Sequence, residues 1–76
     1  LNIKSFLLRK EIALMSLKEQ LIYVRRKLQL TQAELAEKTG IALITIARWE
    51  TVAIKPQMKA YGKFLAFCEA NGIKFE

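Results

Sequence analysis

The side chains of this sequence that could take part in chemistry are mainly cationic. Lysine and arginine number 13 against 7 acidic residues, which gives a formal net charge of +6. A basic surface suits a polyanion such as nucleic acid or an acidic membrane, although a soluble basic protein without such a partner can have the same composition. The sequence contains no histidine and no aspartate, and it offers no nucleophile paired with a base. We therefore expect no metal site, no cofactor and no enzymatic activity.

The length and the cysteine content limit the architecture and the compartment. The chain has 76 residues, of which 53% are hydrophobic. One small domain of this size has a marginal core unless it is well packed or a second subunit completes it, and we expect a homodimer. Cys68 is the only cysteine, which is consistent with a reducing cytoplasm. No apolar run reaches the roughly 18 residues that a membrane span needs, and charged residues interrupt the apolar start. We expect a cytoplasmic protein without a membrane partner.

Two capping boxes predict where two of the helices begin. A hydroxyl residue precedes a glutamate by three positions at two points, Ser16 with Glu19 and Thr31 with Glu34. The first box precedes a helix that begins at Leu17, has apolar residues on one face and ends near residues 28–30. The second box precedes a short helix over residues 32–38. Gly40 can adopt the left-handed conformation that ends this helix and begins a tight turn.

Two further helices follow the turn. The first covers residues 43–50, with Ile46 and Trp49 as its inward candidates. Pro56 can occupy the first turn of a last helix over about residues 57–71, which the Asn71-Gly72 pair ends. The expected apolar stripe of this last helix consists of Met58, Tyr61, Phe64, Leu65 and Cys68.

The two ends of the chain give weaker patterns. Residues 1–15 predict an N-terminal arm or a short helix, and residues 16–76 form the predicted domain. Residues 73–76 alternate apolar and polar side chains, which is typical of a short strand. The sequence therefore predicts an all-α bundle of four to five short helices, with a short C-terminal strand as an option. Two short helices joined by a glycine turn, 32–38 and 43–50, make a helix-turn-helix.

A known family carries the same residues. The run LTQAELAEKTGI at residues 30–41, continued by TIARWE at residues 45–50, resembles the Cro and lambda-repressor-like helix-turn-helix family. The resemblance covers roughly residues 17–71, and the tail from Phe67 to Phe75 also matches some small members. It implies a lambda-repressor-like bundle that binds double-stranded DNA, with residues 43–50 as the recognition helix in the major groove.

The resemblance also implies roles for single residues. Thr31 caps the first helix of the motif, and Gln32 contacts a DNA phosphate at its N-terminus, where free amides favour an anion. Arg25 and Glu50 match a family pair that joins the first and third helices, orients the recognition helix and leaves the arginine near a phosphate. The alternative is two unrelated surface charges. Trp49 corresponds to a core anchor.

Two polar residues of the recognition helix are candidates for DNA contact. Arg48 could contact a guanine edge or a phosphate, or it could be a solvated arginine on the outer face. Thr45 could contact a phosphate or a base, or it could bond to its own backbone.

The sequence departs from the family where relatives contact bases. Ala42 stands where the family has a capping serine or threonine, and Leu43 and Ile44 stand where relatives carry polar or basic residues. Leucine and isoleucine can contact only thymine methyl groups or exclude water. In the loop after Glu50, Lys55 is the only charged residue left to contact phosphates. We call the departing residues the apolar face: Ala42, Leu43, Ile44, Val52, Ala53 and Ile54.

Three interpretations of the apolar face follow. The module binds DNA through Gln32, Arg48 and Lys55, with DNA shape and methyl contacts adding preference. Alternatively, the face docks a protein, as in an antitoxin-like or co-regulator module. As a third possibility, the face belongs to the core because the helix or the loop packs differently. The first interpretation predicts a DNA-binding transcriptional regulator, and the second is the alternative function.

Overall fold

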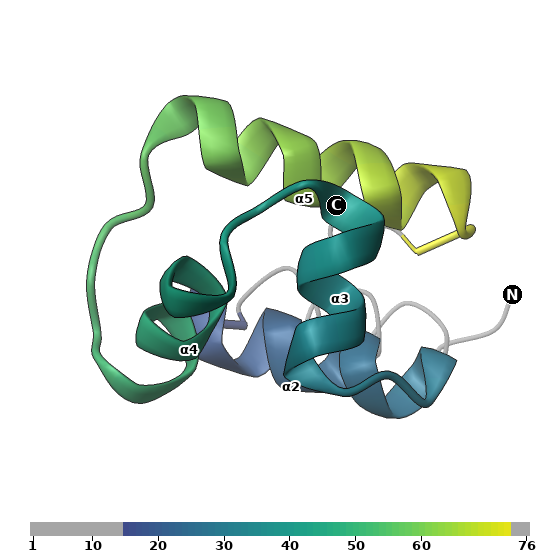
Figure 1. Cartoon of the computed structure of the whole chain (residues 1–76), viewed down its shortest axis with the longest axis horizontal. Coiled ribbons are helices and arrows are strands. Elements are labelled where there is room, and N and C mark those ends of the chain that lie inside the picture. The colour runs from purple at the N-terminus through teal and green to yellow at the C-terminus, as the bar shows by residue number, and fades with distance from the viewer. Residues whose placement is uncertain (1–14, 74–76) are drawn as a thin grey trace, which may run out of the picture.

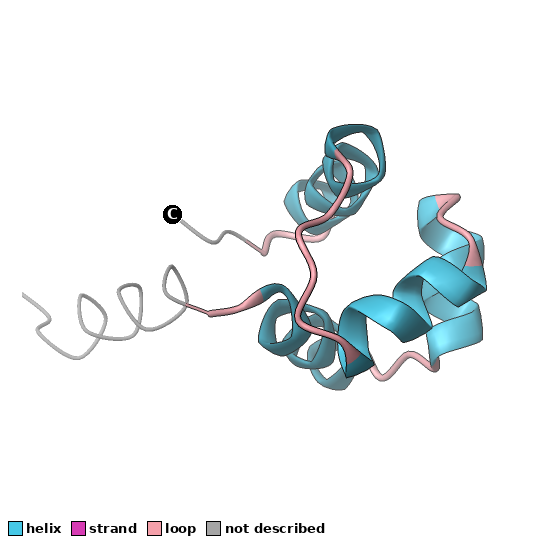
Figure 2. Ribbon diagram, turned by 90° about the vertical axis from the view of Figure 1, so that its left-hand side faces the viewer, coloured by secondary structure: helices cyan, strands magenta, loops and turns pink. Residues whose placement is uncertain are grey.

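The computed structural model of the chain describes residues 15–73, which form an all-α fold. Its four helices are α2 (Leu17–Leu28), α3 (Gln32–Thr39), α4 (Leu43–Thr51) and α5 (Met58–Ala70). α4 packs against α2 and α3, and α3 also packs against α5. Figure 1 shows α2 and α5 along two sides of the bundle with α3 between them. The connection between α4 and α5 runs along the outside of the fold (Figure 2).

Local side-chain and backbone hydrogen bonds define the helix ends. Both predicted capping boxes are confirmed: the hydroxyl oxygens of Ser16 and Thr31 accept hydrogen bonds from the amides of Glu19 and Glu34 at 3.3 and 3.1 Å. Gly40, with φ of 75°, ends α3 in the left-handed conformation, as predicted. The predicted bounds 32–38 and 43–50 each fall one residue short of the observed helix.

The core is a single cluster to which all four helices contribute side chains. It consists of Leu21, Val24, Leu35, Ile41, Ile46, Trp49, Phe64, Cys68 and Ile73. The inward orientation predicted for Ile46 and Trp49 is confirmed, since they are 0% and 2% exposed. Burial raises the pKa of the Cys68 thiol to about 11, which keeps the thiol protonated at neutral pH. Cys68 is therefore a core residue, as its position in the helical pattern predicted.

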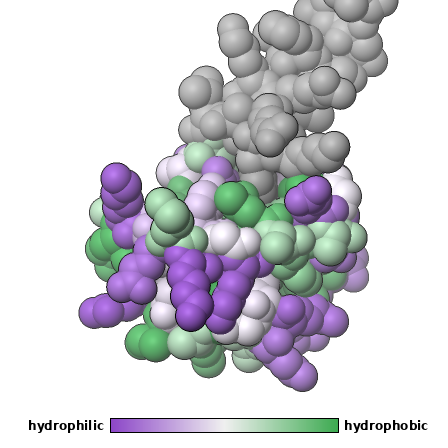
Figure 3. All heavy atoms as spheres, turned by 90° about the horizontal axis from the view of Figure 1, so that it is seen from above, coloured by the Kyte–Doolittle hydropathy of each residue, from purple (hydrophilic) through white to green (hydrophobic). Residues whose placement is uncertain are grey.

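The predicted apolar stripe of α5 is too wide. Met58 is 90% exposed and Leu65 is 39% exposed, whereas Phe64 and Cys68 are buried. Phe64 and Cys68 lie one turn apart and define the inward face, and residue 65 is rotated by about 100° from Phe64. Met58 is the first residue of the helix and lies beyond the core. Seen from the side of α5, the surface mixes hydrophilic and hydrophobic side chains (Figure 3).

The predictions for the two chain ends lie mostly outside the described residues. This applies to the arm or short helix at residues 1–15 and to the strand at residues 73–76, apart from residues 15 and 73. Ile73 lies in no strand; it is buried, and its amide donates to the carbonyl of Cys68 at 2.8 Å. Between residues 15 and 73, none of the helices has both the length and the apolar character needed to cross a membrane.

Candidate nucleic-acid interface

α3, a tight turn and α4 form a helix-turn-helix. The turn begins at Gly40, whose amide donates to the carbonyl of Ala36 at 2.9 Å. The amide of the buried Ile41 then donates to Thr39 Oγ1 at 3.2 Å. From α5, Lys63 Nζ donates to the Gly40 carbonyl at 3.4 Å. The turn is therefore held from both sides, and the Lys63 contact has no signal in the sequence because the two residues lie far apart along the chain.

An ion pair ties α4 to α2. Arg25 Nη1 donates to Glu50 Oε1 at 2.6 Å, so the structure brings the two residues of the predicted pair together. Arg25 Nε also donates to the carbonyl of Leu30 at 3.2 Å, a contact that the sequence did not indicate. One guanidinium group thus connects the end of α2, the turn before α3 and the last turn of α4.

The ion pair is asymmetric in its burial. The Glu50 side chain is 7% exposed, and the Arg25 side chain is 27% exposed. Among the described residues, no donor reaches Glu50 Oε2, although this oxygen is buried. Beside the pair lies a hollow of about 420 Å³ lined by Ile22, Arg25, Arg26, Leu30 and Glu50. The buried carboxylate is compensated by a guanidinium that is itself partly exposed.

The N-terminus of α3 carries a polar side chain and a complete cap. Gln32 is half-buried at the first helical position, directly after the cap residue Thr31. The Thr31 amide donates to Glu34 Oε1 at 2.9 Å, and this bond, with one from the Thr31 side chain, lowers the pKa of the Glu34 carboxyl. Backbone amides in the first turn of a helix have no partner within the helix and attract anions.

The N-terminus of α4, in contrast, is uncapped and apolar. Ala42 provides no side-chain cap, and the next two side chains, Leu43 and Ile44, are 48% and 67% exposed. Thr45 is half-buried, and its amide donates to the Ala42 carbonyl at 3.0 Å. Arg48 is exposed one turn further along the helix.

The loop after α4 extends the apolar face. Val52 and Ile54 are 52% and 42% exposed, and Ala53 and Lys55 are exposed as well. The interpretation that the apolar face belongs to the core is therefore wrong. Ile46 and Trp49 fill the core positions of α4, and the side chains of the apolar face lie on other sides of the helix and in the loop.

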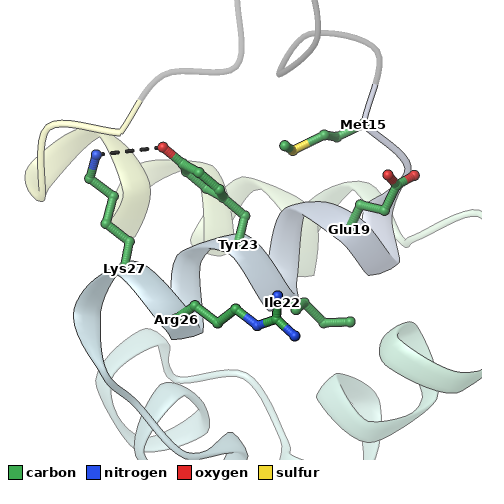
Figure 4. Close-up of a pocket in the computed structure, with 6 residues that line it drawn as sticks. All are labelled: Met15, Glu19, Ile22, Tyr23, Arg26 and Lys27. Atoms are coloured by element: carbon green, nitrogen blue, oxygen red, sulfur yellow. Dashed lines mark hydrogen bonds between the residues drawn. The ribbon is translucent and has the colours of Figure 1, made fainter. Parts of the chain in front are cut away.

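A second hollow lies outside the motif, along α2 (Figure 4). It measures about 580 Å³ and is lined by Met15, Glu19, Ile22, Tyr23, Arg26 and Lys27. Lys27 Nζ donates to Tyr23 Oη at 3.5 Å and lies 5.7 Å from the centre of the tyrosine ring. Neither α3 nor α4 contributes a lining residue to this hollow.

Comparison with known proteins agrees with this geometry. A helix-turn-helix family model of the Cro/C1 type matches residues 21–61, which is more than half of the chain and includes α3, the turn and α4. Proteins of this family bind DNA and are not enzymes. Neither the curated proteins nor the solved structures contain a match to the chain. The chain belongs to the Cro/C1-type helix-turn-helix family.

Proposed function

We propose that this protein is a transcriptional regulator that contacts double-stranded DNA through α3 and through α4 as the recognition helix. The observation that carries the proposal is the helix-turn-helix itself, with α4 tied to α2 by the Arg25–Glu50 pair. In such motifs the second helix enters the major groove while the first crosses the phosphate backbone. The net charge of +6 favours a polyanionic partner.

Four residues are the proposed phosphate contacts. Gln32 acts at the N-terminus of α3, where the helix dipole and open amides favour an anion. Arg25, which is partly exposed and oriented by Glu50, contacts a second phosphate. Thr45 and Lys55 contact the backbone from α4 and from the loop after it. Contacts of this kind set the register on the duplex and the salt dependence of affinity.

The proposed base contacts come from α4. Arg48 is exposed on the second turn and can donate two hydrogen bonds to O6 and N7 of a guanine. Leu43 and Ile44 supply apolar contact from the first turn. The protein acts as a homodimer on two half-sites about one helical turn apart. Sedimentation of the protein with and without duplex tests this oligomeric state.

The first experiment is a salt titration of binding to a labelled mixed-sequence duplex. Affinity should fall as salt rises, with a log–log slope of about −2 per chain if Arg25 and Lys55 each neutralise a phosphate. Lys55→Ala should make this slope shallower by about 1. Lys59→Ala removes an exposed charge from α5 and should leave the slope unchanged. Absence of binding at about 50 mM salt would rule out the regulator.

Two substitutions distinguish a residue that positions the protein on DNA from a residue that determines which sequence is bound. Arg48→Ala should reduce discrimination at one base pair, by about 1–3 kcal/mol. Gln32→Ala should weaken binding to all sequences alike, because a phosphate contact carries no sequence information. If neither variant changes the affinity for any duplex, the proposed contacts are wrong.

The exposed apolar face favours one other candidate, a module that docks a protein partner in the manner of an antitoxin or a co-regulator. Contiguous exposed apolar side chains usually mark an interface. This candidate predicts no salt-dependent binding to duplex DNA. It also predicts loss of a protein complex, rather than loss of DNA affinity, when the face is made polar.

A further inference from the structure

The first turn of α4 presents apolar side chains where a base-reading helix needs donors and acceptors. Leu43 and Ile44 are 48% and 67% exposed, and neither carries a hydrogen-bonding group. In the major groove, the C5-methyl group of thymine is the apolar feature that distinguishes one base pair from the others. The exposed surface of this turn therefore matches a methyl group better than any polar base edge.

The charges around this turn favour DNA over a protein as the occupant. Glu50 is the only acidic residue of α4, and it is buried and paired with Arg25. Arg48 lies four residues after Ile44, so the two side chains are neighbours on one face of the helix. Lys55 is exposed in the loop that follows. A helix that exposes apolar side chains beside Arg48 and no acidic side chain of its own is complementary to a DNA groove lined by phosphates.

We infer that Leu43 and Ile44 determine sequence preference by contacting thymine methyl groups, so that the target of this protein is a duplex with thymines opposite the first turn of α4. The inference rests on the proposed function, because it requires α4 to enter the major groove. Burial of one methyl group against an apolar side chain corresponds to about a three- to fourfold gain in affinity.

The test uses uracil as a thymine without its methyl group. Duplexes that bind the protein are first selected from a random pool, and each thymine of the selected sequence is then replaced singly by deoxyuridine. The hydrogen-bonding groups are unchanged, so affinity should fall about three- to fourfold at the thymines beneath α4 and should not change elsewhere. At the same positions, 5-methylcytosine opposite guanine should bind more tightly than cytosine.

A matched variant assigns the effect to the two side chains. The double variant Leu43→Gln, Ile44→Gln places polar side chains of good helix propensity at exposed positions, and circular dichroism checks that it folds. It should bind thymine and uracil duplexes equally. Salt-dependent binding without any methyl effect, or a methyl effect that persists in the double variant, overturns the inference while leaving the proposed function intact. Absence of binding to every duplex at low salt overturns both.

Discussion

The two helices of the motif begin in opposite ways. α3 begins with a reciprocal cap between Thr31 and Glu34, whereas α4 begins at Ala42, whose side chain accepts nothing. α3 is thus defined by local hydrogen bonds at its start. α4 is held instead by the burial of Ile46 and Trp49 and by the Arg25–Glu50 pair. α4 therefore begins without a side-chain cap, and the Leu43 and Ile44 side chains of its first turn are exposed.

The largest expected effect comes from removing the anchor of α4. Trp49→Ala deletes a side chain that is 2% exposed and should lower the free energy of unfolding by about 3–5 kcal/mol. Leu43→Ala alters an exposed residue of the same helix and should change the free energy of unfolding by less than about 0.5 kcal/mol. Urea denaturation of the two variants measures both values. Equal losses would contradict the division of α4 into an anchored half and an open half.

Breaking the Arg25–Glu50 ion pair should give the second largest loss of stability. Glu50→Gln removes the charge that compensates Arg25 and should destabilise the fold by about 1–3 kcal/mol, a range reduced from that of a fully buried pair because Arg25 is partly solvated. Arg25→Met is the partner variant, and the double variant closes a mutant cycle. Additive losses in denaturation experiments would mean that the pair does not hold α4.

The missing cap of α4 predicts a stabilising substitution. Ala42→Ser introduces a hydroxyl that can accept from the first turn of α4, and it should raise the free energy of unfolding by about 0.5–2 kcal/mol. Thr31→Ala removes the existing cap of α3 and should lower it by about 1 kcal/mol. Thermal unfolding of the two variants compares these opposite changes directly. A loss of stability in Ala42→Ser would show that the start of α4 cannot accommodate a cap.

The smallest expected effect is the pH dependence of the α3 cap. The hydrogen bond from the Thr31 amide to Glu34 holds the pKa of that carboxyl below its usual value of 4.5. Because the folded-state pKa is lowered, the stabilisation is present above about pH 4.5 and is lost as the pH falls through the folded-state pKa. Glu34→Gln should therefore be less stable than the parent protein at neutral pH and should approach it in acid. An unchanged difference across this range in urea denaturation would argue against the ionised cap.

Sequence patterns that span only a few residues predicted most of the fold. The capping box at Thr31 and the Gly40 turn act over three or four positions, and they gave the bounds of α3 to within one residue. The predicted range 43–50, placed after that turn, also matches α4 to within one residue. The buried face of α5 was harder to predict because Met58 and Leu65 are apolar without being buried. An apolar side chain at the edge of a stripe contributes to the pattern whether or not the core reaches it.

Contacts between distant residues were predicted only where a resemblance supplied them. The Arg25–Glu50 pair was anticipated in this way. The hydrogen bond from Tyr61 Oη to Gln20 Oε1, at 2.9 Å, was not, although it links α5 to a glutamine that is 7% exposed. The exposure of Leu43 and Ile44 also needed the structure, since apolar residue types are compatible with a core position.

The central claim is that DNA contacts the first turn of α3, the exposed side of α4 and Lys55. Titration of the isotopically labelled protein with duplex, followed by amide chemical shifts, tests it directly. The largest shifts should arise at Gln32, at residues 42–45, at Arg48 and at Lys55. Shifts concentrated instead at Tyr23 in the α2 hollow or at Met58 on α5, or no shifts at low salt, would contradict it.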